Sequence, residues 1–204
     1  DGSFDNEFSY CTIKNASVGI YTTGGANFDN YKLNLSSVEV YNSSNFGILS
    51  VSSSIDAENL VINKSGQSSF AGTYGGKYRL NHSTISNFWN SGIRQFPSLL
   101  LNNFYIDSDD NEFINNLFDV DITNSIIDGN QNIEFLIEKL GDTNLDYKLS
   151  NSLIKFNDIN DYFDNDSIIF IEWPEILESI IPLNKSYKIK IKSIDNNKRD
   201  IRFR

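Results

Sequence analysis

The sequence has very few of the residues that build disulfide frameworks and transition-metal sites. Its 204 residues include 1 cysteine, 1 histidine, 3 prolines and no methionine. Because Cys11 has no second thiol to pair with, an intramolecular disulfide is excluded. A single cysteine and a single histidine also supply too few ligands for a zinc site. The fold must therefore be stabilised by its apolar core and its hydrogen bonds.

Basic residues and long apolar runs are also scarce. The chain carries 17 lysines and arginines against 27 aspartates and glutamates, so its net charge is −10 at pH 7. A chain of this charge repels nucleic-acid phosphates, and we expect no nucleic-acid partner. No stretch approaches the roughly 20 apolar residues that a transmembrane helix needs, so we expect no transmembrane segment.

A short pattern recurs along most of the chain. An apolar residue is followed two places later by a polar residue and five places later by isoleucine or valine. The apolar residues are Phe8, Leu35, Ala57, Leu80, Leu101, Ile122 and Leu149, and the later residues are Ile13, Val40, Ile62, Ile85, Ile106, Ile127 and Ile154. A period of about 22 residues indicates a solenoid, because each unit is too small to bury its own apolar face.

The polar position between these two residues favours asparagine. It is occupied by Tyr10, Ser37, Asn59, His82, Asn103, Asn124 and Asn151. Asparagine tolerates the left-handed backbone conformation of a sharp corner, and stacked side chains there can bond to one another. We therefore predict a strand, a tight bend and a second strand in each repeat, with Asn59, His82, Asn103, Asn124 and Asn151 forming a structural ladder.

These repeats resemble a known family. The matching segments are Phe8–Ile20, Gly75–Trp89, Phe96–Asn103, Asn124–Asn130 and Asn151–Lys155. They are similar to the right-handed parallel β-helix of pectate-lyase-like proteins, and in particular to bacterial cell-envelope β-helix-repeat proteins, which are often lipoproteins. The resemblance implies an all-β chain of about seven coils of roughly 22 residues. It also implies an exported protein at the outer membrane or cell surface of a Gram-negative bacterium, facing outward or toward the periplasm.

The repeats divide the chain into two parts. Residues 1–157 are expected to form the β-helix, as a piece that begins within the helix, and a lipid anchor of the parent protein would lie outside this chain. Residues 158–204 are expected to form an irregular C-terminal cap of the same domain, with a strand over Lys185–Ile194. The insertion Glu134–Gly141 is interpreted as either a strand or a short helical turn.

Two groups of side chains are candidate binding sites. Tyr74, Trp89 and Arg94 would offer an aromatic face and a guanidinium to a glycan or protein, although Trp89 would alternatively pack under a neighbouring loop. Asp107, Asp109 and Asp110 would offer oxygen ligands to Ca²⁺, with a solvated turn as the alternative. We expect no other cofactor or metal.

No catalytic constellation accompanies the repeats, so we predict a non-catalytic β-helix that serves as a structural or accessory component and binds an envelope protein complex or a polysaccharide. The alternative is a polysaccharide lyase or glycoside hydrolase whose active-site residues lie partly outside this piece. Among the β-helix enzymes that this chain resembles, the lyases use clustered carboxylates that bind Ca²⁺ together with a Lys or Arg base on the outer face of the helix. The hydrolases use a group of carboxylates as acid, base or nucleophile.

Overall fold

The computed structural model describes residues 3–25, 29–143, 145–155, 189–195 and 198–203. These residues form 19 strands and no helix, which confirms the prediction of an all-β chain. The chain separates into two compact units, Asp1–Asn157 and Asp158–Arg204. Among the described residues, no helix is long and apolar enough to cross a membrane.

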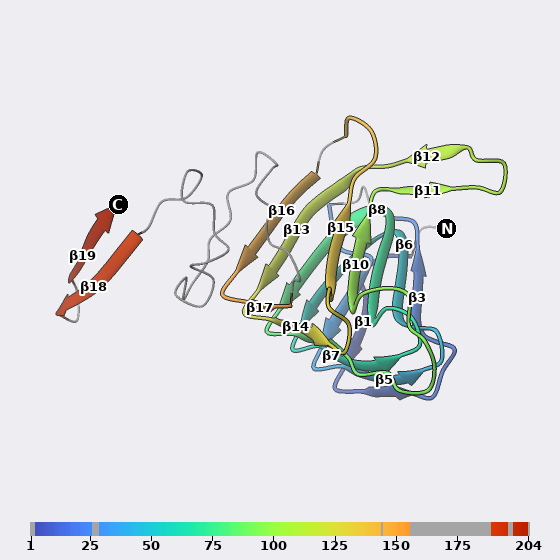
Figure 1. The fold of residues 1–204 in the computed structure, drawn as a ribbon, viewed down its shortest axis with the longest axis horizontal. Helices are drawn as coiled ribbons and strands as arrows, with labels where there is room; N and C mark the ends of the chain where they lie inside the picture. Colours follow the sequence, from blue (N-terminus) through green and yellow to red (C-terminus); the bar gives the residue numbers. More distant parts are fainter. Residues whose placement is uncertain (1–2, 26–28, 144, 156–188, 196–197, 204) are drawn as a thin grey trace. The chain divides into compact units, whose positions relative to one another are not determined.

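The larger sheet of the first unit consists of strands that pair in parallel (Figure 1). Within the described residues its nine members are β1 (Asn6–Ser9), β3 (Val18–Thr23), β4 (Leu33–Ser36), β6 (Phe46–Glu58), β8 (Phe70–Asn81), β10 (Leu99–Asn102), β13 (Leu117–Thr123), β15 (Phe135–Glu138) and β16 (Leu145–Ser150). The insertion expected near residue 135 is thus a strand, β15, and not a helical turn.

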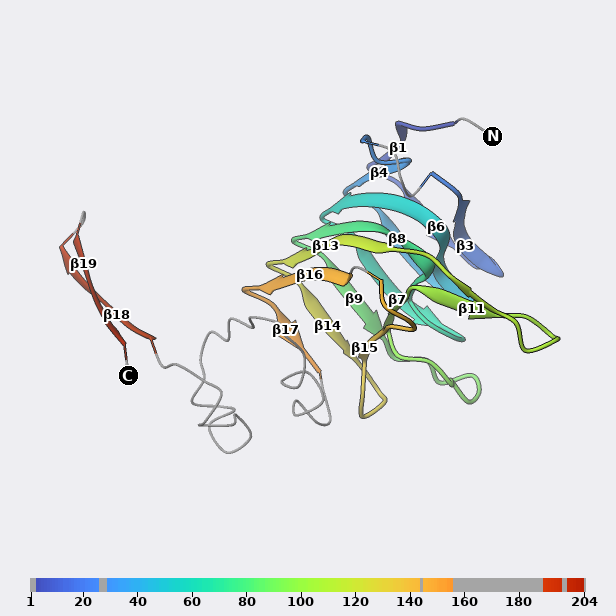
Figure 2. The ribbon, with the colours of Figure 1, turned by 90° about the horizontal axis from the view of Figure 1, so that it is seen from above.

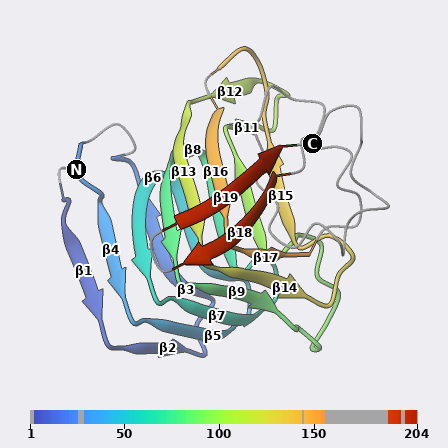
Figure 3. The same ribbon diagram turned by 90° about the vertical axis from the view of Figure 1, so that its left-hand side faces the viewer.

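A second parallel sheet begins where these strands turn a corner. In the described part of the chain it has six strands, β2 (Thr12–Lys14), β5 (Glu39–Ser43), β7 (Val61–Ser65), β9 (Thr84–Asn87), β14 (Ile126–Gly129) and β17 (Leu153–Ile154). Seen from above, the strands of this sheet are stacked along the same axis as the strands of the larger sheet (Figure 2). Figure 3 shows them crossing beneath the larger sheet.

The pairing registers join residues that occupy the same position in successive repeats. In the larger sheet, Ala57 pairs with both Leu35 and Leu80. In the second sheet, Ile62 pairs with Val40 and with Ile85. All six of these side chains are buried in one apolar core. The long parallel sheets are compatible with the predicted β-helix.

The corner between the two sheets is made by the predicted polar position. Tyr10, Ser37, Asn59, His82, Asn124 and Asn151 have positive φ angles of 51°, 55°, 55°, 48°, 51° and 50°. The prediction of a strand, a tight left-handed bend and a second strand is therefore confirmed at these positions. The side-chain ladder is less regular than predicted. Asn59 Nδ2 donates to Ser37 Oγ at 3.1 Å, whereas Asn124 donates to Asn81 at 3.4 Å instead of reaching His82.

A more regular ladder lies one residue further on, inside the corner. The hydroxyl of Ser125 accepts a hydrogen bond from the backbone N–H of Ser83 at 3.0 Å, and the hydroxyl of Ser152 accepts one from the N–H of Ser125 at 3.1 Å. Cys11 and Val38 occupy the same repeat position. The serine hydroxyls at this position thus connect successive repeats through the core side of the bend.

The predicted repeat at Leu101 is wrong. Leu80 pairs directly with Ile122, while Leu101 pairs with Gly72 and Ile137 in another part of the sheet. Asn103 is consequently not a member of the corner ladder. Its buried side-chain amide instead donates to Leu140 O at 2.9 Å and to Thr143 Oγ1 at 2.7 Å.

The chain beyond Asn103 leaves the sheets as an antiparallel hairpin, β11 (Phe104–Ile106) and β12 (Glu112–Ile114). Ile106, predicted to be a core residue, is 52% exposed in this hairpin. The hairpin extends away from the stacked strands (Figure 1). It is the structural reason why the sequence pattern at 101–106 does not add a strand to the second sheet.

The second unit contains a separate antiparallel pair, β18 (Ile189–Asp195) and β19 (Lys198–Phe203). The strand expected over Lys185–Ile194 is confirmed from Ile189 onward. Residues 156–188, which hold most of the expected cap, lie outside the described residues, and the capping role stays a prediction.

The alternation of buried and exposed residues in β14 gives a direct test of the core. Ile127 is fully buried, whereas its neighbour Ile126 is 42% exposed. We expect Ile127→Ala to lower the free energy of unfolding by about 2–5 kcal/mol, because it leaves a cavity in a close-packed core. Ile126→Ala should cost about 1 kcal/mol or less. Urea denaturation of both variants measures the difference, and equal losses would contradict the inward orientation of Ile127.

Candidate functional site

The three residues of the predicted binding platform do not share one environment. Tyr74, near the middle of β8, packs edge-to-face on Tyr105 of the β11–β12 hairpin, with ring centroids 5.0 Å apart. Trp89 follows β9 and is half-buried, and its backbone carbonyl accepts a hydrogen bond from Asn130 at 2.7 Å. Their side chains belong to two local structures, the hairpin base and the loop after β9.

Arg94, predicted as a ligand-binding residue, is buried and its guanidinium is paired within the fold. Its side chain is 3% exposed and forms an ion pair with Glu134, whose side chain is fully buried. The two guanidinium nitrogens lie 2.5 Å and 2.8 Å from the two carboxylate oxygens. Arg94 also donates to the backbone carbonyl of Phe96 at 2.8 Å. The guanidinium of Arg94 is therefore not accessible to a ligand.

The carboxylate of Glu134 is held in its ionised form by several donors. Burial alone would raise its pKa, but the hydrogen bonds from Arg94, the backbone N–H of Gln131 and the hydroxyl of Ser98 lower the pKa below its usual value. Sequence reasoning missed this pair because its partners are far apart in the chain and no repeat position links them.

The acidic turn forms the tip of the β11–β12 hairpin. The carboxylate of Asp107 accepts hydrogen bonds from the backbone N–H groups of Asp109 and Asn111, both at 2.9 Å. The Asn111 amide also donates to it, and these bonds lower the pKa of Asp107. Asp109 and Asp110 are exposed. Within the described residues, no group of three or more His, Cys, Asp or Glu side chains is arranged to hold a metal ion.

Charged side chains line the outward face of the larger sheet. The guanidinium of Arg79 forms two hydrogen bonds with Asp56, and the Arg79 and Lys77 cations lie 5.8 Å and 4.8 Å from the ring centroid of Tyr31. Burial and the nearby carboxylate of Asp119 raise the pKa of Tyr31 to about 12. The phenol is therefore protonated at neutral pH, and the aromatic ring is already occupied by its own cations.

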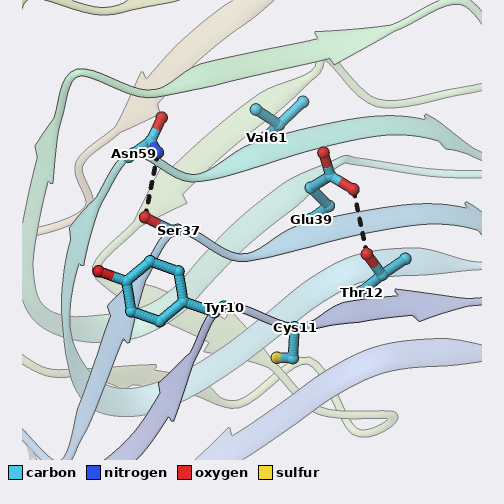
Figure 4. A pocket seen from close by; sticks show the side chains of 7 residues that line it. All are labelled: Tyr10, Cys11, Thr12, Ser37, Glu39, Asn59 and Val61. Atoms are coloured by element: carbon cyan, nitrogen blue, oxygen red, sulfur yellow. Dashed lines mark hydrogen bonds between the residues drawn. The ribbon is translucent and has the colours of Figure 1, made fainter.

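A hollow of about 330 Å³ lies at the corner between the first strands of the two sheets (Figure 4). Its lining combines three corner residues, Cys11 at the next position, and outward-facing residues of β2, β5 and β7. The full set is Tyr10, Cys11, Thr12, Ser37, Glu39, Asn59 and Val61. This volume falls at the lower end of the range of small-ligand sites, which is about 300–1,000 Å³. The hollow is thus large enough for a small polar ligand such as a sugar unit.

The aromatic ring of the hollow is unusually accessible. Tyr10 is 85% exposed, because the left-handed bend directs its side chain away from both sheets. Beside it, the Asn59 amide bonds to Ser37, so these polar groups are fixed next to the ring (Figure 4). An exposed tyrosine ring flanked by ordered polar groups suits stacking against a ligand that has one apolar and one polar face.

A carboxylate with a fixed orientation faces the same hollow. Glu39 accepts hydrogen bonds from the hydroxyl of Thr12, at 3.1 Å, and from the hydroxyl of Tyr41. The bond from Tyr41, and then the bond from Thr12, lower the pKa of Glu39, while Glu39 raises the pKa of Tyr41. The Glu39 carboxylate is therefore an ionised hydrogen-bond acceptor whose orientation is already fixed before a ligand binds.

The hollow could have been found from the repeat itself. Thr12, Glu39 and Val61 occupy one repeat position and pair with one another across β2, β5 and β7. Tyr10 is the one large aromatic residue at the corner position. Placing both positions on the outward side of the corner would have indicated the site.

Comparisons of the chain with protein-family models, with curated protein sequences and with solved structures give no match. The functional assignment therefore depends on the geometry of these residues.

The Arg94–Glu134 pair gives a test of what stabilises the loops around it. We expect Glu134→Gln to lower the free energy of unfolding by about 3–5 kcal/mol, because a buried guanidinium loses its counter-charge. The matched control is Arg79→Gln, which breaks a surface pair whose arginine side chain is 53% exposed. It should cost about 1 kcal/mol or less. Urea denaturation at neutral pH measures both, and similar losses would contradict a structural role specific to the buried pair.

The same pair predicts an acid dependence. Because the pKa of Glu134 in the folded state lies below its usual value of 4.5, its contribution to stability is complete above that pH. It is lost as the pH falls through the folded-state pKa. Between about pH 5 and pH 3, the wild type should lose more stability than Glu134→Gln. Parallel pH dependences of the two proteins would contradict this linkage.

Proposed function

We propose that this chain is part of a non-catalytic β-helix of a bacterial cell envelope, and that it binds a neutral glycan at the corner hollow. In this proposal the two parallel sheets are faces of one right-handed parallel β-helix. The support is the pairing of equivalent repeat positions in both sheets, together with the rule that about 98% of parallel crossover connections are right-handed. Six stacked corners, not seven, make up the described coils of this helix.

The observation that carries the function is that the exposed ring of Tyr10 and the ordered carboxylate of Glu39 line the same hollow. The ring of a sugar can stack on the tyrosine, while its hydroxyl groups donate to Glu39 and to the amide oxygen of Asn59. A fixed carboxylate repels an acidic polysaccharide but accepts hydrogen bonds from a neutral one. The net charge of −10 favours the same choice.

An envelope location fits a stiff surface of this kind. Stacked repeats make an elongated scaffold whose outward positions recur in columns, and such a surface suits an accessory subunit or an outer-surface component. Export, the outer membrane or cell surface as the location, and a lipid anchor outside this chain are parts of the proposal that come from the family resemblance. Bound Ca²⁺ is no part of it.

Glycan binding can be measured by isothermal titration calorimetry against neutral oligosaccharides of glucose, mannose and N-acetylglucosamine, with oligogalacturonate as the acidic comparison. We expect at least one neutral series to bind, and Tyr10→Ala to weaken that binding by about tenfold or more. Glu39→Gln should also weaken it, through the loss of a charge-assisted acceptor. Tyr21→Ala is the matched control, because Tyr21 is 62% exposed and does not line the hollow.

Two results would overturn the proposal. The first is the absence of neutral-glycan binding, or binding that survives Tyr10→Ala. The second is the release of reducing or unsaturated sugar ends from a polysaccharide, which would favour the alternative of a lyase or hydrolase. The carboxylates around Tyr31, those of Asp56, Asp119 and Asp121, would then be the first candidates for catalysis, since they gather on the outward face of the larger sheet.

A further inference from the structure

The β11–β12 hairpin exposes more apolar surface than a solvated loop of its length requires. Tyr105, Ile106, Phe113 and Ile114 are 43%, 52%, 38% and 38% exposed. Exposed apolar side chains gathered on one short element of this kind mark an interaction site. The hairpin also projects from the stacked strands (Figure 1), and none of its residues lines the corner hollow.

Both faces of the hairpin are apolar. Tyr105 and Phe113 lie opposite each other and stack, with ring centroids 4.6 Å apart and ring planes 6° apart, and Tyr74 packs on the edge of this pair. Because side chains alternate between the faces of a strand, Ile106 and Ile114 lie on the other face. The core of the first unit cannot bury both faces at once.

The backbone of the hairpin has two unused edges. Among the described residues, β11 pairs with β12 alone and β12 with β11 alone. The bonds from Asp107 N to Asn111 O and from Asn115 N to Asn103 O identify the inward-facing positions. In an antiparallel pair these positions alternate with outward-facing ones. The N–H and C=O groups of Ile106 and Glu112 therefore point away from the partner strand, where another strand can bind them.

The hairpin is held rigidly at its base, as a docking element needs to be. The side chain of Asn103 bonds to both backbone groups of Leu140, and the Asn115 amide donates to Ser52 Oγ at 2.8 Å. A strand that is already ordered loses little conformational entropy when it accepts a partner. The rigid base therefore favours binding at the tip and edges.

The charge of the tip selects the partner. Asp107, Asp109, Asp110 and Glu112 fall within six residues that contain no lysine or arginine. A second copy of this chain would bring the same carboxylates against them, so pairing between copies is opposed by like charges. A partner strand that alternates apolar and basic residues satisfies the apolar faces, the open edge and the charge together.

We propose that the β11–β12 hairpin is a docking element for another protein, which adds an extended, basic and apolar strand to one of its free edges. Strand addition of this kind obtains affinity from backbone hydrogen bonds and specificity from alternate side chains. The proposal does not depend on glycan binding, because the hairpin and the corner hollow share no lining residue.

The test uses the full chain and a short, end-blocked, fluorescein-labelled peptide in which lysine and isoleucine alternate. Fluorescence anisotropy should show saturable binding, weakened when the salt concentration rises from about 0.05 M to about 0.5 M. A peptide in which glutamate replaces every lysine should bind at least about tenfold more weakly. Equal binding of the two peptides, or no binding of the basic peptide, would overturn the proposal.

Substitutions locate the binding surface. Ile106→Ser should weaken peptide binding by about tenfold, whereas Ile126→Ser, the same change at an exposed strand position outside the hairpin, should leave it unchanged. Ile106→Pro and Glu112→Pro each remove one outward N–H without removing a bond between β11 and β12. One of the two should abolish binding while the thermal unfolding midpoint stays near that of the wild type. If both proline variants bind like the wild type, strand addition is wrong.

Discussion

Parallel pairing between equivalent residues of successive repeats is the constraint on which the rest of this structure depends. Each strand bonds to the next through backbone groups, so a side chain at one repeat position lies about 4.7–4.9 Å from its equivalent in the neighbouring strand. Val40, Ile62 and Ile85 are inward together because they share one position. For the same reason Thr12, Glu39 and Val61 all face outward, and the hollow with its aromatic ring is a direct product of the register.

The corner adds a second constraint, which acts on the backbone and not on the side chain. A left-handed bend is costly for most residues, and asparagine and glycine adopt it most readily. Tyr10, Ser37 and His82 nevertheless adopt it, because the strands on both sides are fixed by pairing. The bend leaves the side chain in solvent, so a residue can change there without disturbing the core. That freedom is what permits a large exposed ring at Tyr10.

The sequence was sufficient for features that depend on one repeat position at a time. The buried residues at equivalent repeat positions, the corner and the succession of strands could all be predicted from the spacing of the repeat pattern. The segment at Leu101 could not be distinguished from a true repeat by its sequence, because Asn103 fits the same pattern. In the structure the Asn103 amide instead bonds to Leu140 in another loop. Arg94 was misassigned for a related reason. Its partner Glu134 is 40 positions away in the chain, and only the folded structure brings the two charges together.

Leu80 pairs directly with Ile122 although a long segment lies between them in the chain. The order of the stacked strands therefore does not depend on the length of the segment that connects them. The segment between β9 and β13, which contains Arg94 and the β11–β12 hairpin, is an insertion that leaves this pairing in place. Doubling the length of a flexible connection costs only about 0.6 kcal/mol of closure entropy. Such a scaffold accepts new segments between its strands at little thermodynamic cost. Diversification of this chain can therefore proceed by insertion, with recognition elements gained or exchanged while the stacked strands remain as they are.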